Sequence, residues 1–463
     1  MNQTHASASL IASLADCVGV DHVRGDESSL AAYAADALGQ GSRPDVVVMP
    51  GSTTEIAGIA RLCNEQRVPL VVRGAGTGYT GGAVPTRGGV VVSMERLHRI
   101  LVIDELNLLA VVQPNVITGD LQRAVERVGL FYPPDPASLD SSSIGGNVAE
   151  CAGGPRAFKY GTTKRYVLAL EAVLPTGEIV RTGSKAVKNV VGYDLTQLLV
   201  GSEGTLAIIT EITLRLVPQP PARATLCASF GSIQQAVDAV TALIHRRVVP
   251  ACIELVDTDS IRAVEAYLNK QVVATGAAAQ LIVECDGARA AVEEEIAQVS
   301  EACRDAGTLE LRRAASEAER DDVWSVRRQL SLALRATGLL KINHDVVVPR
   351  GRIAALFDVI AALKTKYQLQ VAAFGHAGDG NIHVNLMIDR ADETARARAK
   401  RAERELFEQV VALEGSISGE HGIGFAKAPY LAIELSPDVI ALMQRVKSAF
   451  DPNGILNPGK IFP

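Results

Sequence analysis

The sequence predicts an α+β protein built from two or three folded units, and three features of its 463 residues indicate this. Short runs rich in β-branched residues alternate with amphipathic helical patterns through the first half of the chain. Residues 216–222 then contain three prolines, which mark a domain boundary. The chain is also longer than one ordinary core requires, and its 48% hydrophobic and 21% charged residues are typical of a globular protein.

The first half carries the expected strands and one helix with a clear start. Runs of β-branched residues predict strands at 45–49, 68–72, 89–93, 109–113 and 207–216. A helix is predicted from Thr54 to Gln66, because Ser52 and Glu55 form a capping pattern before an amphipathic run. These elements precede the prolines and are expected to belong to one unit.

After the prolines the pattern changes to strand, helix, strand, helix, up to about residue 414. The alternating stretches are 224–230, 233–244, 251–255, 259–267 and 279–284. This order predicts an antiparallel sheet backed by helices on one face.

Charge and cysteine content exclude several classes of function. A formal net charge of -6 gives no reason to expect nucleic acid, and the basic run 390–404 is interrupted by three acids, as on a solvated helix face. The seven cysteines lack C-x-x-C spacing, so neither a disulfide framework nor an iron–sulfur cluster is expected. Without a signal pattern or a spanning apolar run, a cytoplasmic protein is expected, with peripheral attachment to the inner membrane as the alternative.

Two glycine-rich segments bring three of the eight histidines beside a glutamate. Residues 373–385 (AFGHAGDGNIHVN) predict two strands joined by a tight turn. His383 and Asn385 would share a strand face, with His376 on the opposing strand. Together with Glu420, two imidazoles and a carboxylate suit Zn²⁺, or else Mn²⁺ or Fe²⁺. The alternative is that these histidines are structural residues with ordinary hydrogen bonds.

A second chemical feature is the segment 71–82 (VVRGAGTGYTGG), a strand that runs into a glycine-dense loop. Glycines let the backbone approach a phosphate and point its N–H groups at it, which predicts a pyrophosphate cradle. Gly76, Gly78 and Gly81 satisfy G-x-G-x-x-G, but a dinucleotide fold of that kind needs a helix after the loop. The glycines and Pro85 that follow exclude such a helix, so an NAD-type site is not expected. A connection without a ligand is the alternative.

Two further segments are weaker signals when each is taken alone. Residues 132–161 form a long stretch rich in small polar residues, and ordered loops of this composition usually line a site. Residues 200–210 form another glycine turn that leads into an apolar strand.

Taken in order, these motifs resemble one family over nearly the whole chain. The signatures are PGSTTEI at 50–56, RGAGTG at 73–78, PPDP at 133–136, SIGGN at 143–147, GYDLT at 192–196, GSEGTL at 201–206, HAGDGNIH at 376–383, GEHGIG at 419–424 and DPNGILNPGKI at 451–461. The set is similar to that of the FAD-linked oxidases of the vanillyl-alcohol oxidase and p-cresol methylhydroxylase (PCMH) type. Within them it resembles the D-2-hydroxy-acid dehydrogenases, which include D-lactate dehydrogenase, the glycolate oxidase FAD subunit and D-2-hydroxyglutarate dehydrogenase.

The resemblance implies three parts: a PCMH-type FAD-binding domain at 1–218, a substrate-binding cap of the FAD-linked oxidase C-terminal type at 219–424, and a segment at 425–463 that packs back on the FAD domain. It also implies a set of FAD-binding residues: Arg73, Gly74, Ala75, Gly76, Thr77, Gly78, Thr80, Gly81, Gly82, Pro134, Ser143, Gly146, Asn147, Ala152, Gly153, Glu203, Gly204, Ile208, Ile209 and Asn457. Relatives with covalent flavin often have a histidine in the first glycine loop. Thr77 stands there instead, so noncovalent FAD is expected, with Cys151 as a remote covalent candidate.

The same resemblance assigns roles around the substrate. His376, His383 and Glu420 correspond to the metal ligands, and His421 to the catalytic base. Asn385 would hydrogen-bond the substrate carboxylate.

Residues on a W-x-x-R motif would complete the binding of that carboxylate. Arg327 follows Trp324 in this pattern and would clamp the carboxylate, with Lys341 as a second positive charge. Arg328 is the alternative clamp, and Ser331 one turn later also faces the substrate if the helix is regular. An acid was expected where His344 precedes the run 346–349, which departs from the family pattern.

The function expected from these residues is FAD-dependent oxidation of a D-2-hydroxy acid by hydride transfer from C2 to flavin N5. D-lactate is the first candidate, D-2-hydroxyglutarate the second and glycolate, as for a glycolate oxidase FAD subunit, the third. Other possibilities are a metal-free oxidation of another alcohol and a noncatalytic flavin-binding subunit. Expected partners are a small 2-hydroxy acid and an external electron acceptor: a quinone, a cytochrome, an electron-transfer flavoprotein or an iron–sulfur subunit. A homodimer is one option for the assembly.

Overall fold

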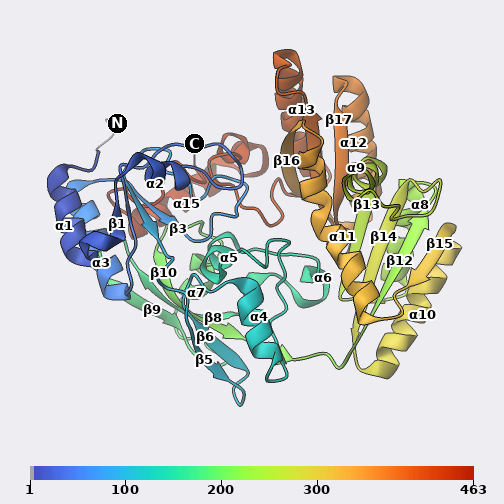
Figure 1. The fold of residues 1–463 in the computed structure, drawn as a ribbon, viewed down its shortest axis with the longest axis horizontal. Coiled ribbons are helices and arrows are strands. Elements are labelled where there is room, and N and C mark those ends of the chain that lie inside the picture. Colours follow the sequence, from blue (N-terminus) through green and yellow to red (C-terminus); the bar gives the residue numbers. More distant parts are fainter. Residues whose placement is uncertain (1–4, 463) are drawn as a thin grey trace. The chain divides into compact units, whose positions relative to one another are not determined.

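The computed structural model describes residues 5–462 of the chain. It separates into two compact units, which Figure 1 traces from blue to red along the sequence. Unit 1 comprises Met1–Gly153, Thr162–Gln219 and Glu420–Pro463, and unit 2 comprises Gly154–Gly161 and Pro220–Gly419. The chain therefore passes briefly into unit 2 at residues 154–161, leaves unit 1 again at the proline-rich stretch and returns to it inside the GEHGIG motif.

Unit 1 contains a four-stranded sheet, a five-stranded sheet and a two-stranded ribbon. Its strands are β1 (Val23–Arg24), β2 (Val46–Val48), β3 (Leu70–Arg73), β4 (Val90–Ser93), β5 (Ile100–Asp104), β6 (Leu109–Val112), β7 (Leu130–Phe131), β8 (Val167–Val173), β9 (Ile179–Gly183), β10 (Ile208–Arg215) and β11 (Val217–Pro218). Its helices are α1 (Ala8–Val18), α2 (Glu27–Ala32), α3 (Thr53–Gln66), α4 (Thr118–Glu126), α5 (Ile144–Glu150), α7 (Leu195–Leu199), α14 (Leu431–Glu434) and α15 (Pro437–Phe450).

The two larger sheets of unit 1 differ in strand direction. The first has the order β1-β2-β4-β3, with parallel pairing of β2 and β3 to β4. The second has the order β5-β6-β10-β8-β9 and is antiparallel throughout. Helices α1 and α3 pack on the first sheet around a buried cluster that includes Leu14, Ile59 and Leu70. The predicted helix and strands of this half are confirmed to within about two residues at each end.

The C-terminal tail completes the first sheet of unit 1. Leu456 forms a parallel bridge with Leu70 of β3, and the Leu70 N–H donates to the Ile455 carbonyl at 2.8 Å. The loop of residues 74–89 between β3 and β4 contains no helix, as predicted for a chain without an NAD-type site.

Unit 2 is built on one antiparallel sheet of seven strands, in the order β15-β12-β14-β13-β17-β18-β16. The strands are β12 (Ala222–Phe230), β13 (Cys252–Asp257), β14 (Ala279–Gly287), β15 (Thr308–Arg313), β16 (Leu340–Val347), β17 (Gln370–His376) and β18 (Asn381–Ile388). The helices are α6 (Ala157–Tyr160), α8 (Ile233–His245), α9 (Thr258–Leu268), α10 (Arg289–Asp305), α11 (Glu317–Ala336), α12 (Ile353–Tyr367) and α13 (Glu393–Ala412). Figure 1 shows this sheet running from green to orange.

The sheet of unit 2 has helices on both faces, not on one face as the sequence predicted. Helices α8 and α10 pack on one face of β12 and β14. On the opposite face, α9 and α11 bury a cluster that includes Val256, Leu330 and Phe374. Because the side chains of a strand alternate, each face receives its own set of residues from the same strands.

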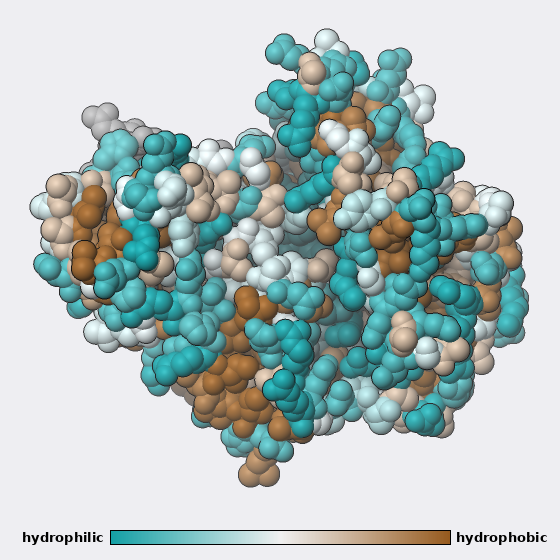
Figure 2. Space-filling model, viewed as in Figure 1, coloured by the Kyte–Doolittle hydropathy of each residue, from teal (hydrophilic) through white to brown (hydrophobic). Residues whose placement is uncertain are grey.

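The surface of unit 1 carries several exposed hydrophobic side chains. Figure 2 shows a hydrophobic area in the part of the view where Figure 1 labels β5 and β6. Leu106, between these strands, is 91% exposed. None of the helices in residues 5–462 combines the length and apolar character that a membrane span requires.

Candidate functional site

The register of the sheet in unit 2 brings most of the predicted site residues to one face. His383 lies opposite both Phe374 of β17 and Asp345 of β16. In the same way Asn385 lies opposite Asn343, and His376 lies opposite Glu254 of β13. Partners across a ladder point to the same side, so these side chains share the face that α9 and α11 cover.

The predicted hairpin forms as β17, a turn at residues 377–380, and β18. The turn depends on Gly380, which has φ +88°, and a Cβ there would lie 2.0 Å from the Val348 carbonyl oxygen. His376 and His383 are diagonal neighbours on this hairpin, with ring centroids 5.3 Å apart and the planes at 86°. Both are buried, as a site within the cap requires.

Glu254 connects two of the predicted site residues. Its Oε2 accepts a hydrogen bond from Nε of Arg327 at 2.6 Å and forms an ion pair with Nη2 of the same side chain at 2.5 Å. Its Oε1 lies 2.6 Å from Nδ1 of His376. Burial alone would raise the pKa of Glu254, but the positive charge of Arg327 and the contact with His376 hold that pKa below its ordinary value. Glu254 is therefore an ionised carboxylate without solvent exposure.

Arg327 is the arginine of the W-x-x-R motif that points to the sheet. Its side chain is buried and its guanidinium lies 4.8 Å from the centre of the Phe374 ring, whereas Arg328 is exposed. Trp324, one turn earlier on α11, donates from Nε1 to Oε2 of Glu284 at 2.9 Å. Trp324 and Arg327 of α11 thus contact glutamates on two neighbouring strands, β14 and β13.

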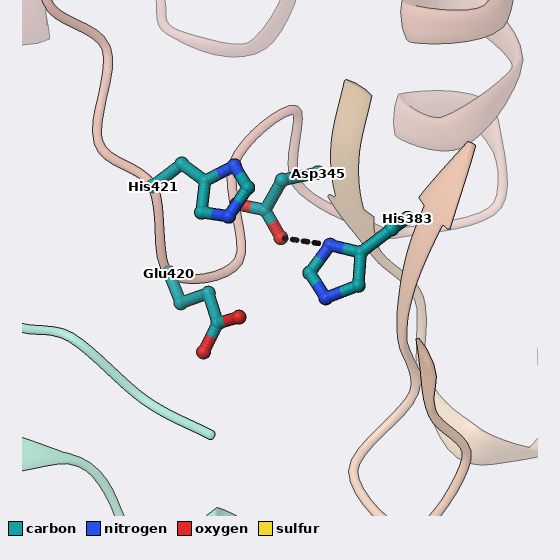
Figure 3. A group of neighbouring side chains, drawn as sticks. All are labelled: Asp345, His383, Glu420 and His421. Carbon is teal, nitrogen blue, oxygen red and sulfur yellow. Dashed lines mark ion pairs between the residues drawn. The ribbon is translucent and has the colours of Figure 1, made fainter. Parts of the chain in front are cut away.

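Asp345 holds the end of unit 2 in place. Its carboxylate is fully buried and accepts from Nδ2 of Asn381 at 2.6 Å and from the N–H of Gly419 at 2.9 Å. Its Oδ1 also lies 3.8 Å from Nδ1 of His383, the ion pair dashed in Figure 3. The next residue along the chain after Gly419 is Glu420.

His344 points away from this face. It contacts Phe407 of α13 edge-on, with ring centroids 5.4 Å apart, and its Nδ1 lies 3.6 Å from Glu403. The acid that the sequence led us to expect at this position is supplied by its neighbour Asp345, because adjacent strand residues face opposite sides.

Lys341 and Asn385 lie farther along the same face. Nζ of Lys341 donates to Oγ of Ser331 at 2.5 Å, which places Ser331 on the sheet side of α11. Burial, and then the positive charge of Arg335, lower the pKa of Lys341 to about 7. Asn385 is fully buried, and its Oδ1 accepts from Nδ2 of Asn343 at 2.8 Å.

Glu420 and His421 begin the segment that belongs to unit 1. A Cβ on Gly153 would lie 2.6 Å from Oε2 of Glu420, so this carboxylate contacts the loop after α5. The ring of His421 stacks on Tyr79 of the glycine loop, with centroids 5.3 Å apart and planes at 23°. The hydroxyl of Thr80 donates to the His421 carbonyl at 3.0 Å.

The glycine loop of unit 1 fits a pyrophosphate. Within residues 5–462 no hydrogen bond engages the backbone N–H groups of Gly76, Thr77 and Gly78. Ser143 caps α5 through the N–H of Gly146 at 3.3 Å and also accepts from the N–H of Ala75 at 3.3 Å. Amides left without protein acceptors on a loop are suited to an anion.

Asn457 joins the C-terminal tail to β3, to the glycine loop and to residue 203. Its Oδ1 accepts from the N–H of Val72 at 3.2 Å, and its Nδ2 donates to the Glu203 carbonyl at 2.7 Å and to the Gly82 carbonyl at 3.4 Å. The Glu203 carboxylate in turn accepts from the N–H groups of Ile423 at 2.7 Å and Gly424 at 2.6 Å.

The acids of this loop region are deeply buried. Burial, together with the nearby Glu203 carboxylate, raises the pKa of Glu150 well above its ordinary value. The pKa of Glu203 is also raised by burial, although the amides of Ile423 and Gly424 oppose this. A protonated Glu150 beside an anion site would avoid repelling the anion.

The sequence pattern did not reveal Glu254 or Asp345 as members of the site. The available signal was an acid inside an apolar strand: Glu254 interrupts the buried stretch 252–256. Buried charges need partners, so such a residue predicts an ion pair without saying which.

Comparison with known proteins identifies the family. The family described as "FAD linked oxidases, C-terminal domain" matches residues 219–461, and the one described as "FAD binding domain" matches residues 44–183. Since the first match covers more than half of the chain, this protein belongs to the FAD-linked oxidases and is an FAD-binding oxidoreductase.

The chain is similar to curated proteins over nearly its full length. It is 44% identical to glycolate oxidase subunit GlcD of Bacillus subtilis over 93% of this chain and 92% of that protein. It is 39% identical to a D-lactate dehydrogenase of Anaerostipes hadrus over 91% of this chain and 90% of that protein.

Solved structures confirm the fold. A p-cresol methylhydroxylase structure matches with a TM-score of 0.81 at 19% identity, over 98% of this chain and 96% of that one. A 4-ethylphenol oxidase from Gulosibacter chungangensis matches with a TM-score of 0.80 at 22% identity, over 98% and 97%. The predicted PCMH-type α+β fold is therefore confirmed.

Proposed function

We propose that the protein oxidises a D-2-hydroxy acid to the 2-oxo acid, with D-lactate as the first candidate substrate. The observation that carries this proposal is the polar face of the sheet in unit 2, where Arg327, Lys341 and Asn385 lie among buried histidines. Such a face suits a small anion that also carries a hydroxyl group. The named relatives, a glycolate oxidase subunit and a D-lactate dehydrogenase, support this substrate class.

The cationic groups would bind and orient the substrate carboxylate. Arg327 uses Nε and Nη2 for Glu254, so its Nη1 side is the one available for the carboxylate. Lys341 adds positive charge below about pH 7. To bind the carboxylate, Asn385 would give up one of the two hydrogen bonds that its Nδ2 donates, at 3.1 Å each, to the carbonyls of Ala372 and His383. A second carboxylate at Lys341 would favour D-2-hydroxyglutarate, the second candidate; glycolate is the third.

We assign proton transfer to His421 and metal binding to His376, His383 and Glu420. When bound, a divalent ion, first of all Zn²⁺, would lower the pKa of the substrate hydroxyl, and FAD would accept the hydride from C2. His421 would take the hydroxyl proton, and its stacking on Tyr79 of the glycine loop orients the ring.

The donor set supports a metal of this kind. Asp345, His383, Glu420 and His421, drawn in Figure 3, offer the carboxylate and imidazole atoms that Zn²⁺, Mn²⁺ and Fe²⁺ take. Gly419, whose N–H donates to Asp345, directly precedes Glu420 and His421 in the sequence. Asp345 is thus a further candidate ligand beside His383 and Glu420, whereas His376, the third residue assigned, is not a member of this group.

The remaining assignments concern the partners of the reaction. We propose that residues 1–218 and 425–463 hold FAD without a covalent bond, and that residues 219–424 form the substrate cap. Electrons then pass to an external acceptor, which is a quinone, a cytochrome, an electron-transfer flavoprotein or an iron–sulfur subunit. A cytoplasmic enzyme, either free or attached to the inner membrane, and a homodimer are part of the same proposal.

Steady-state reduction of a dye tests the proposed function. D-lactate should support dye reduction and L-lactate should not, and D-2-hydroxyglutarate and glycolate rank the alternatives. Removal of metal with a chelator should abolish the activity, and Zn²⁺ or Mn²⁺ should restore it. Full activity in the chelated protein would contradict the metal assignment, and equal rates with both lactate enantiomers would contradict the substrate assignment.

A further inference from the structure

We propose that Glu254 is a positioning residue that fixes the substrate clamp Arg327 and the metal-ligand candidate His376 at the same time. This inference rests on the proposed function for the roles of those two residues. The contacts of Glu254 itself lie wholly within unit 2 and involve β13, β17 and α11.

The position of Glu254 in the sheet explains why it reaches both partners. It lies on β13, opposite His376 of β17 on one side and Ile282 of β14 on the other. The helix α11 covers this face and brings Arg327 above β13. A carboxylate between a strand neighbour and a helix neighbour can use one oxygen for each, as Glu254 does.

The contact with His376 selects one ring nitrogen. A hydrogen bond of 2.6 Å from Nδ1 to an ionised carboxylate requires the proton on Nδ1. Nε2 is then the nitrogen with a lone pair for a metal ion, and the carboxylate raises its basicity. Loss of such a carboxylate typically weakens metal affinity by about 10–100-fold.

The contact with Arg327 selects one side of the guanidinium. Nε donates a hydrogen bond to Oε2 of Glu254, Nη2 lies 2.5 Å from the same oxygen, and the guanidinium carbon lies 4.8 Å from the centre of the Phe374 ring. The remaining Nη1 side is therefore held in one orientation before any substrate arrives. Misplacing a binding group by about 1 Å can lower a rate by roughly 100-fold, so the orientation of Arg327 bears directly on turnover.

Glu284 offers a matched control within the same sheet. It is a buried glutamate on β14 whose carboxylate accepts from Trp324 of α11 at 2.9 Å and from Oγ1 of Thr225 at 2.8 Å. It thus makes the same kind of contact with the same helix, but neither Arg327 nor His376 is among its partners in these hydrogen bonds. If a substitution acts only by disturbing the packing between α11 and the sheet, replacing either glutamate should have a similar effect on Zn²⁺ affinity and KM.

The test compares Glu254→Gln with Glu284→Gln in the full-length, FAD-loaded protein. Glutamine keeps the shape but presents an N–H₂ group to Arg327 or to His376, so a donor faces a donor at one of the two contacts. We expect Glu254→Gln to weaken Zn²⁺ binding to the metal-depleted protein by about 10–100-fold. The KM for D-lactate should rise by about tenfold or more, while Glu284→Gln stays within about twofold of wild type in both measurements.

A double variant shows whether the clamp is involved. In an Arg327→Met background, Glu254→Gln should raise KM no further, because the group it orients is gone. An additional rise of the same size as in the wild-type background would overturn the link between these two residues. Circular dichroism and FAD content report whether each variant is folded; if Glu254→Gln is not, Glu254→Asp replaces it, with a smaller loss expected in the same two measurements.

The outcomes separate this inference from the proposed function. If wild type oxidises D-lactate but Glu254→Gln keeps wild-type Zn²⁺ affinity and KM, only the role of Glu254 is overturned. If no hydroxy acid reduces the flavin of the wild-type protein, the proposed function fails. The Zn²⁺ affinity of Glu254→Gln then still tests whether Glu254 positions His376. A folded wild type that binds no divalent ion overturns the metal part of both.

Discussion

Replacing Asp345 with asparagine should weaken the hydrogen bonding of the segment around Gly419, where unit 2 ends. The Asp345 carboxylate accepts from the N–H of Gly419 at 2.9 Å, and a hydrogen bond to a charged group contributes about 1.5–3 kcal/mol. Asn381 Nδ2, at 2.6 Å, is a second donor to the same carboxylate. An asparagine can accept with one atom only, so one of these two donors loses its partner. If that donor is Gly419, its amide should exchange roughly 10–100-fold faster.

Hydrogen exchange followed by mass spectrometry on peptides that cover residues 415–422 measures this change locally. A local measurement is needed because a chain of two units does not unfold in one two-state step. Glu284→Gln, another buried acid of the same sheet, serves as the control and should leave these peptides unchanged. Asp345→Ala removes both acceptor oxygens, so unaltered exchange in that variant, or equal acceleration in Asp345→Asn and Glu284→Gln, would refute the view that Asp345 anchors this segment.

Three more predictions follow from single residues. The pKa of Lys341 is lowered to about 7, so its side chain loses its positive charge as the pH rises through 7. The KM for D-lactate should therefore rise above pH 7. In a profile of KM against pH, Lys341→Met should remove this dependence. Gly380→Ala places a Cβ 2.0 Å from a carbonyl oxygen at a residue with positive φ, so the urea concentration at the midpoint of unfolding should fall. Gly351→Ala, with open space around it, should leave that midpoint unchanged. Asn457→Ala removes the hydrogen bonds that join the C-terminal tail to β3 and to Glu203. Titration with FAD should therefore show weaker binding. Unchanged FAD affinity would contradict a role of the tail in the cofactor site.

Local sequence signals predicted the hairpin and the glycine loop well, because turn residues act on their own neighbourhood. Gly380 requires positive φ whatever the rest of the chain does, and the glycines after Arg73 exclude a helix. The α+β class and most strands followed from the same kind of pattern. The family resemblance gave the candidate residues of the site, whose chemical roles stay predictions.

The partners of the buried acids could not be predicted in the same way. Glu254 meets His376 only because β13 pairs with β17, and 121 residues of chain separate these two positions along the sequence. Asp345 and His344 are adjacent, and only the register of β16 against β18 decides which of them faces the site. The two-sided helical cover of the sheet was missed for the same reason: a helix pattern gives its apolar face but not the sheet face on which it packs.

The α6 segment illustrates a further limit of local signals. Residues 157–160 lie within a stretch that the sequence marked as a long loop, yet they form a short helix that belongs to unit 2. Nζ of Lys159 and the hydroxyl of Tyr160 both bind the Asp286 carboxylate, each at 2.7 Å. Contacts with a strand more than 100 residues away leave no mark in the local composition.

An anaerobic visible spectrum of the purified protein, taken before and after D-lactate is added, tests the central claim most directly. FAD bound to unit 1 should give an oxidised flavin band, and D-lactate should bleach it without any added acceptor. Parallel samples with D-2-hydroxyglutarate and glycolate rank the three acids. A flavin band that none of the acids bleaches would contradict the proposed substrate class, although the family would stand.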